Sequence, residues 1–174
     1  MQDGPRSSER EASQWTEPLQ AAVAAFFLVS AVVNTVIVVA FADLYRSYYT
    51  QVYQRARLPA DQLGASVDGS VTVITVITVV LAVTYLVLAG LSFFRRLGWI
   101  FIVDMIVLFL AGAPSLVGGV LNLVSPSQAG LPQVFALTQL VLSLVALSLF
   151  ILMLGLSLRY GLWAQRRSSV AVAE

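Results

Sequence analysis

The residue with the clearest chemical potential is Asp104, a carboxylate that stands alone within a long apolar stretch. An acid at that depth in a bilayer is costly unless it is neutral or has a polar partner. At about 1.5 Å per residue along antiparallel helices, Thr84, Tyr85 and Ser148 come to a similar depth. Two interpretations follow. Either these hydroxyls satisfy Asp104 and help to fix helix packing, or Asp104 is a proton or cation site, because desolvation favours the neutral acid.

The composition of the chain is that of a membrane protein. Its 174 residues are 59% hydrophobic and 11% charged, whereas soluble domains carry about 25% charged residues. Cys, His and Lys are absent, which excludes thiol chemistry and removes the commonest general base and metal ligand. A net charge of +1 gives no basic surface for nucleic acid. We therefore expect no enzymatic activity, no cofactor, no metal and no nucleic-acid partner.

Four apolar runs are long enough to cross a bilayer, at residues 19–42, 71–94, 97–123 and 132–158. The Val-rich start of the second run would favour a strand in water, but open strands leave unpaired backbone groups in lipid. We predict an all-α polytopic membrane protein with four transmembrane helices in an antiparallel bundle. Alternatively, Ala40-Phe41-Ala42 ends a cleaved secretory signal, although the run exceeds the usual apolar core of about 7–15 residues.

The polar segments divide the chain into a flexible cytoplasmic tail (1–18), one transmembrane domain (19–167) and a flexible C-terminal tail (168–174). Within the domain, residues 43–70 form an outer connection in which Pro59 ends a helical extension and residues 61–70 form a loop. Tyrosines recur at helical spacing in this connection. They form an aromatic belt, or alternatively a ligand or partner surface: Tyr45, Tyr48, Tyr49 and Tyr53.

Arginines predict the orientation of the bundle. With four spans both termini lie on one side, which then carries seven of the ten arginines. Five of these seven flank the spans: Arg95, Arg96, Arg159, Arg166 and Arg167. The positive-inside rule places both termini in the cytoplasm. The exclusive use of Arg, with many Ala, Val, Leu and Gly residues, suggests a GC-rich genome and hence the bacterial cytoplasmic membrane.

Small residues in the third run indicate close packing against another helix. Ala111, Ser115 and Gly119 are spaced by four residues, a pattern that lets helix backbones approach each other. We therefore expect a packing or accessory component, or a homo-oligomer, whose partners are the lipid bilayer and other membrane proteins. The alternative function is a small transporter or proton/cation pathway centred on Asp104, with Pro114 interrupting the helix.

The segments Ser-Phe-Phe-Arg-Arg-Leu-Gly-Trp (92–99) and Tyr-Gly-Leu-Trp-Ala-Gln-Arg-Arg (160–167) complete this layout. In its order of polar tail, spanning segments, arginine turn and basic end, the chain resembles the uncharacterised small four-helix integral membrane proteins common in actinobacteria. The resemblance implies a shared architecture and carries over no catalytic residue. Small multidrug exporters differ by a Glu in the first span. Quinone-linked thiol oxidoreductases, tetraspanins and claudins differ by their Cys residues.

Overall fold

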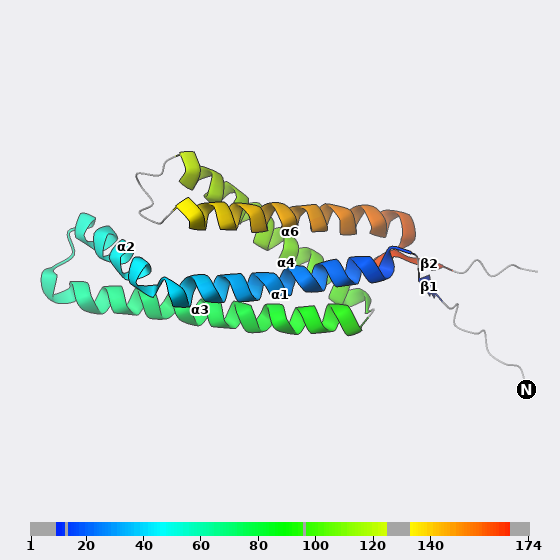
Figure 1. Cartoon of the computed structure of the whole chain (residues 1–174), viewed down its shortest axis with the longest axis horizontal. Helices are drawn as coiled ribbons and strands as arrows, with labels where there is room; N and C mark the ends of the chain where they lie inside the picture. The colour runs from blue at the N-terminus through cyan, green and yellow to red at the C-terminus, as the bar shows by residue number, and fades with distance from the viewer. Residues whose placement is uncertain (1–9, 13, 96, 125–132, 168–174) are drawn as a thin grey trace, which may run out of the picture.

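Four long helices form the molecule in the computed structural model, which describes residues 10–12, 14–95, 97–124 and 133–167 (Figure 1). They are α1 (Thr16–Ala40), α3 (Ala60–Phe94), α4 (Gly98–Val124) and α6 (Gln133–Tyr160), and the shorter α2 (Ala42–Arg55) links α1 to α3. All four are long and apolar enough to cross a membrane, which confirms the predicted all-α class with four spanning helices.

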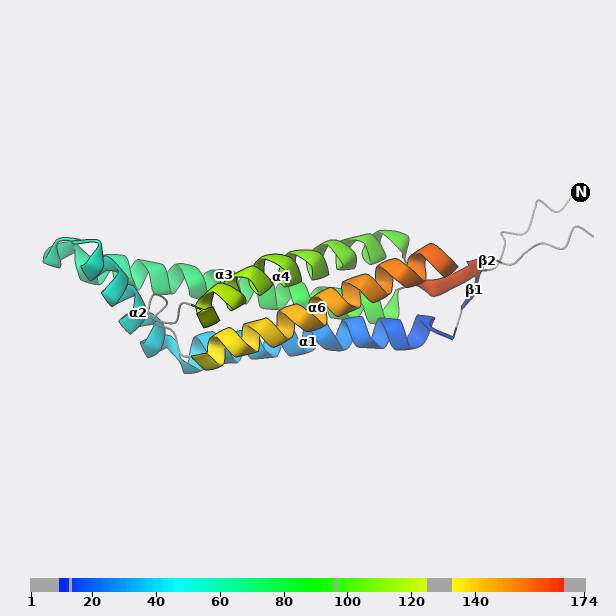
Figure 2. The same cartoon turned by 90° about the horizontal axis from the view of Figure 1, so that it is seen from above.

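The helices pack mainly as two pairs. Helix α1 lies along α3, and α4 lies along α6, while α4 runs obliquely across the other helices in the view of Figure 1. The view from above shows α1 beside α6 as well (Figure 2). Of the most apolar stretch of α1, 39% is buried, against 11% for α3. Helix α1 is therefore the central element, and α3 contributes one narrow face to the core.

A two-stranded ribbon lies at one end of the bundle. There β1 (Arg10–Ala12) pairs antiparallel with β2 (Gln165–Arg167), next to the short 3-10 helix η1 (Leu162–Ala164) and the α3–α4 turn (Figure 1). The sequence did not predict this ribbon. Because β1 and the first turn of α1 fall within residues 1–18, the predicted tail is shorter than expected. Residues 1–9 and the predicted tail at 168–174 lie outside the described residues.

At the other end, the predicted loop at residues 61–70 is wrong, because α3 already begins at Ala60. Gly64 and Gly69 suggested a loop, but a glycine within a helix costs only about 1 kcal/mol. Packing of α2 against α3 offsets that cost, and the Tyr53 and Ser70 hydroxyls lie 2.6 Å apart in a hydrogen bond. The connection at residues 43–70 is therefore a helical hairpin.

Candidate functional site

Asp104 points into the bundle and is 0% exposed. Its Oδ2 lies 2.6 Å from the Ser92 hydroxyl oxygen, in a hydrogen bond that joins α4 to the end of α3. The Gln20 side chain of α1 donates to the Ser92 carbonyl oxygen at 3.1 Å. Three helices thus meet at one buried polar cluster, Gln20–Ser92–Asp104.

The hydrogens of this cluster favour a neutral Asp104. Ser92 Oγ also lies 2.7 Å from the Leu88 carbonyl oxygen, yet a serine hydroxyl has one hydrogen to donate. A protonated Asp104 supplies the second hydrogen and satisfies both contacts. Asp104 Oδ1 has no hydrogen-bond partner among the described residues, and an unpaired buried oxygen is far less costly in a neutral acid than in a carboxylate.

The predicted partners of Asp104 are elsewhere. Thr84 and Ser148 are exposed and donate to backbone carbonyls of their own helices, at Val80 and Leu144. Tyr85 is half-buried and stacks on a ring of α1. The depth estimate assumed parallel neighbours, whereas α4 crosses obliquely (Figure 1). In addition, a helical side chain leans toward the N-terminus of its own helix, which directs Asp104 toward the α3–α4 turn.

A second polar contact, which is partly buried, lies between α1 and α6. Gln139 of α6 donates to the Asn34 side-chain oxygen of α1 at 3.0 Å. The nearby Ser143 hydroxyl, which is buried, donates to the Gln139 carbonyl at 2.6 Å. This contact places Asn34 and Gln139 in one layer of the bundle. This pair ties α1 to α6.

Trp163 is the buried side chain that sequence reasoning missed. An aromatic residue directly after a span usually lies at the membrane interface, yet Trp163 is 0% exposed. Gly161, at φ 87°, ends α6 and turns the chain back. The Trp163 indole then donates to the Leu97 carbonyl at 3.0 Å and packs edge-on against Phe101, with ring centroids 5.2 Å apart. The pattern Gly-x-Trp directly after an apolar run is the feature of the sequence that could have indicated this burial.

Helices α4 and α6 approach each other at a residue outside the predicted stripe. A Cβ on Gly112 would lie 2.6 Å from Leu147 Cγ, so this glycine is the close contact. Ala111 and Ser115 flank it and are partly buried, while Gly119 lies outside the residues whose packing is described. The sequence thus predicted a close contact through small residues of α4, and in the structure the contact residue is Gly112, next to the predicted Ala111. Helix α4 continues through Pro114.

Four of the five arginines expected to set topology lie at the end of the bundle that carries the ribbon. Arg95 follows α3 and Arg159 lies in the last turn of α6, both exposed and both at the end that carries the ribbon. Arg166 and Arg167 lie in β2, and Arg96 lies outside the described residues. The side of the membrane that this end faces stays a prediction.

Tyr49 and Tyr53 of α2 line an amphipathic groove of about 530 Å³ against the first half of α3. Tyr49 and Tyr53 stack there, with ring centroids 6.3 Å apart. Burial raises the pKa of Tyr45 above its ordinary 10.0, and Tyr49 raises it further. An exposed ion pair, Arg46–Asp68 at 2.8 Å, lies on the same hairpin and contributes little in water. The phenols of Tyr45 and Tyr49, whose pKa burial raises, therefore stay neutral at physiological pH.

Asp104 does not line either groove of the bundle that we describe, one beside Tyr49 and the other between α4 and α6. Within the described ranges, no three carboxylate, His or Cys side chains gather into a metal-binding group. The arrangement around Asp104 therefore resembles a packing contact more than a water-filled pathway.

Two substitutions of Asp104 distinguish a neutral side chain from an ionised one. Asp104→Asn keeps a donor and an acceptor, so its free energy of unfolding should stay within about 1 kcal/mol of wild type. Asp104→Ala removes the link to Ser92 and should cost up to about 2 kcal/mol, as for hydrogen bonds between membrane helices. Denaturant titration in mild detergent, followed by circular dichroism, measures both. Equal losses in the two variants would indicate an ionised Asp104.

No protein-family model matches the chain, and no curated protein or solved structure shows significant similarity to it.

Proposed function

We propose that the protein is a non-enzymatic membrane component that assembles with copies of itself through helix α3. The observation that carries this proposal is a stripe of five lipid-exposed valines on α3, each between 55% and 58% exposed. Their spacing alternates between three and four residues: Val73, Val76, Val80, Val83 and Val87. We call these residues the valine stripe.

The valine stripe lies on the side of α3 that faces away from the bundle. Each residue turns an α-helix by about 100°, so the five valines fall within a sector of about 80°. Helix α3 contacts α1, α2 and α4. Its buried side chains lie on the side opposite the stripe: Val67, Thr78, Leu88, Ala89 and Ser92. Helix α3 thus has one face inside the chain and a regular second face outside it.

The spacing supports a helix partner rather than lipid alone. A lipid-facing surface needs apolar side chains, but it does not need the alternating three-and-four repeat, which is the seam of left-handed helix pairs. Valine holds one main rotamer in a helix, so ordering it at an interface costs little entropy. A second copy inserted in the same direction would place its α3 parallel, with the two stripes in register about a twofold axis.

The distribution of arginines supports a placement of both termini in the cytoplasm, in a bacterial cytoplasmic membrane. A transport route through Asp104 is the weaker candidate. It needs water at a side chain that is 0% exposed and that lines neither groove.

The number of chains per particle tests the proposal. Native mass spectrometry in mild detergent should give particles of at least two chains for wild type and single chains for Val80→Trp, which places a bulky ring in the stripe. Val79→Trp is the matched control, because Val79 is 52% exposed at nearly the same depth but is turned about 100° away. A monomeric wild type, or equal effects of the two variants, would contradict assembly through α3.

A further inference from the structure

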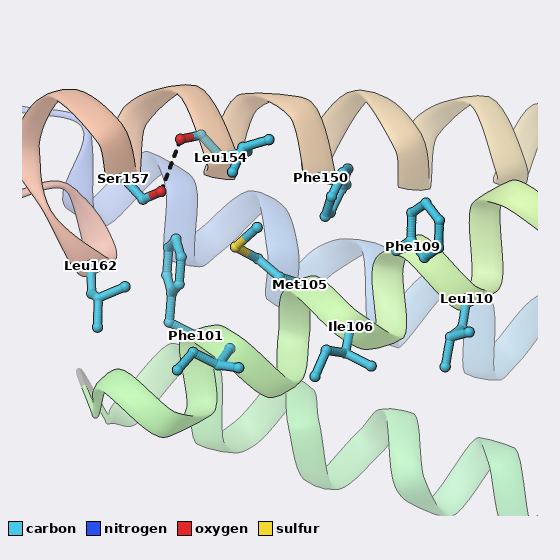
Figure 3. Close-up of a pocket in the computed structure, with 10 residues that line it drawn as sticks. Phe101, Met105, Ile106, Phe109, Leu110, Phe150, Leu154, Ser157 and Leu162 are labelled. Carbon is cyan, nitrogen blue, oxygen red and sulfur yellow. Dashed lines mark hydrogen bonds between the residues drawn. The ribbon is translucent and has the colours of Figure 1, made fainter.

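The segment that follows α6 closes the end of the bundle that carries the ribbon. Gly161 reverses the chain at φ 87°, and η1 then contacts both α1 and α4. Leu162 lies against α4, where a Cβ on Gly98 would be 2.9 Å from its side chain. It lines a groove between α4 and α6 together with Phe101 (Figure 3). We call residues Gly161–Ala164 the lid.

Two hydrogen bonds fasten the lid to these helices. The Trp163 indole donates to the Leu97 carbonyl, next to the start of α4, at 3.0 Å. The Thr16 hydroxyl, at the start of α1, donates to the Ala164 carbonyl, also at 3.0 Å. Trp163, Ala164 and Thr16 are all fully buried. The lid is therefore seated on both helices, by a hydrogen bond at each.

The polar cluster Gln20–Ser92–Asp104 lies directly inside this end. Gln20 comes four residues after Thr16 on α1. Asp104 comes three residues after Phe101, the ring on which Trp163 packs. Residues three or four apart share one face of a helix, so the lid touches the faces that carry the cluster, about 5 Å nearer the end. The lid therefore covers the cluster from the ribbon end.

The backbone of the lid is strained, which favours opening. Trp163 (φ 56°, ψ 29°) and Ala164 (φ 50°) both lie in the left-handed region, which is unfavourable for residues that carry a side chain. Such strain persists only where the surrounding contacts hold it. The contacts of Trp163 and Ala164 therefore keep the lid shut, and their loss would release the strain together with the segment.

The ribbon is coupled directly to the lid. Strand β2 begins at Gln165, the residue after Ala164, and β1 ends at Ala12, four residues before Thr16. Ala12 and Gln165 are also the ribbon pair nearest to the lid. The two strands thus continue from the same segments that the hydrogen bond between Thr16 and Ala164 joins. Separation of the strands would act on that bond first.

We propose that the lid is a gate that controls whether water reaches Asp104 from the ribbon end, and that pairing of β1 with β2 holds the gate shut. In the closed state Asp104 is dry and joins α4 to α3 through Ser92. In the open state water competes for that hydrogen bond and weakens the link between the two helices. The gate is built on α1, α4 and α6, so it is independent of assembly through the valine stripe.

The reactivity of a single thiol in the cluster tests the gate. The chain contains no cysteine, so Ser92→Cys places one reporter beside Asp104, and a water-soluble maleimide reacts with it only when the lid opens. Ser143→Cys reports loosening of the whole bundle, because Ser143 is buried and lies about 25 Å along α6 from the lid. Purified full-length protein in mild detergent is labelled, and intact-mass measurement gives the rate.

Two pairs of variants open the gate or leave it closed. Thr16→Val removes the hydroxyl that fastens the lid, whereas Thr35→Val removes one that donates within α1. Glu11→Pro/Ala12→Pro breaks the ribbon, because successive pairs of an antiparallel ladder alternate between hydrogen-bonded and non-bonded ones and proline lacks the N–H. Glu11→Ala keeps the backbone donor and is the control for the ribbon variant.

Thr16→Val and the ribbon variant should each raise the labelling rate of Ser92→Cys about fivefold, the factor for loss of one hydrogen bond. Both controls should label as slowly as Ser92→Cys alone, and Ser143→Cys should stay slow in every background. The proposal is overturned if either variant labels no faster than its control, if Ser143→Cys accelerates in parallel, or if Ser92→Cys alone reacts as fast as it does in the unfolded chain.

Discussion

Replacing Trp163 by alanine should lower the free energy of unfolding by about 3–5 kcal/mol, the cost of deleting a large buried aromatic side chain. Trp163 is fully buried, contacts the ring of Phe101, and donates its indole hydrogen to the Leu97 carbonyl. Its loss would leave a cavity where α4 and α6 meet near η1, together with an unpaired carbonyl. The segment from Gly161 to Ala164 should then detach.

Denaturant titration in mild detergent, followed by circular dichroism, measures this loss. Trp99→Ala is the control, because it removes the same side chain two residues after Leu97 from a position that is 56% exposed. It should change stability by about 0.5 kcal/mol or less. Trp163→Phe keeps most of the ring volume but loses the hydrogen bond, so it should cost about 1 kcal/mol. If Trp163→Ala were as stable as Trp99→Ala, Trp163 would not anchor the turn.

Replacing Gly112 by alanine should destabilise the bundle by about 1–3 kcal/mol, the usual cost of overpacking. The new Cβ would lie 2.6 Å from Leu147 Cγ and 3.2 Å from the Leu147 backbone nitrogen. Because part of this obstacle is backbone, α4 and α6 must move apart to admit the methyl group. The better helix propensity of alanine offsets about 1 kcal/mol at most.

Gly155→Ala should change the free energy of unfolding in the opposite direction to Gly112→Ala in the same assay. Gly155 lies on α6, and a Cβ there would meet no atom within 4 Å. The substitution should therefore leave stability unchanged or raise it by up to about 1 kcal/mol through helix propensity. A Gly112→Ala variant as stable as wild type, or as stable as Gly155→Ala, would show that α4 and α6 do not meet at Gly112.

The spanning helices were predictable because hydrophobic length alone determines them. The four apolar runs each became a helix, and the ends differed by a few residues except in α3. That exception has a physical reason. Asp61, Gly64 and Gly69 made the start of α3 look like a loop, but the tertiary contact between Tyr53 and Ser70 holds it helical. The residues around the start of α3 do not by themselves reveal a contact with a residue seventeen positions away.

The buried polar cluster was predictable in part. Asp104 was identified as the intramembrane acid because a single charge in an apolar run is conspicuous, and it is indeed buried. Its partner Ser92 was missed because depth counting treats helices as parallel rods, whereas α4 crosses obliquely. Trp163 was missed because aromatic residues after a span usually lie at the interface. Its burial depends on the positive φ of Gly161, which sequence spacing does not reveal.

The central claim, assembly through the valine stripe, is tested most directly by disulfide trapping in intact membranes. The chain contains no cysteine, so a single introduced thiol can pair only with the same residue in another copy or with another protein. Val80→Cys should give a dimer of the chain on mild oxidation, and the dimer should disappear on reduction. Val79→Cys, one residue away and turned by about 100°, should stay monomeric. A monomeric Val80→Cys, or equal trapping at both positions, would contradict the account.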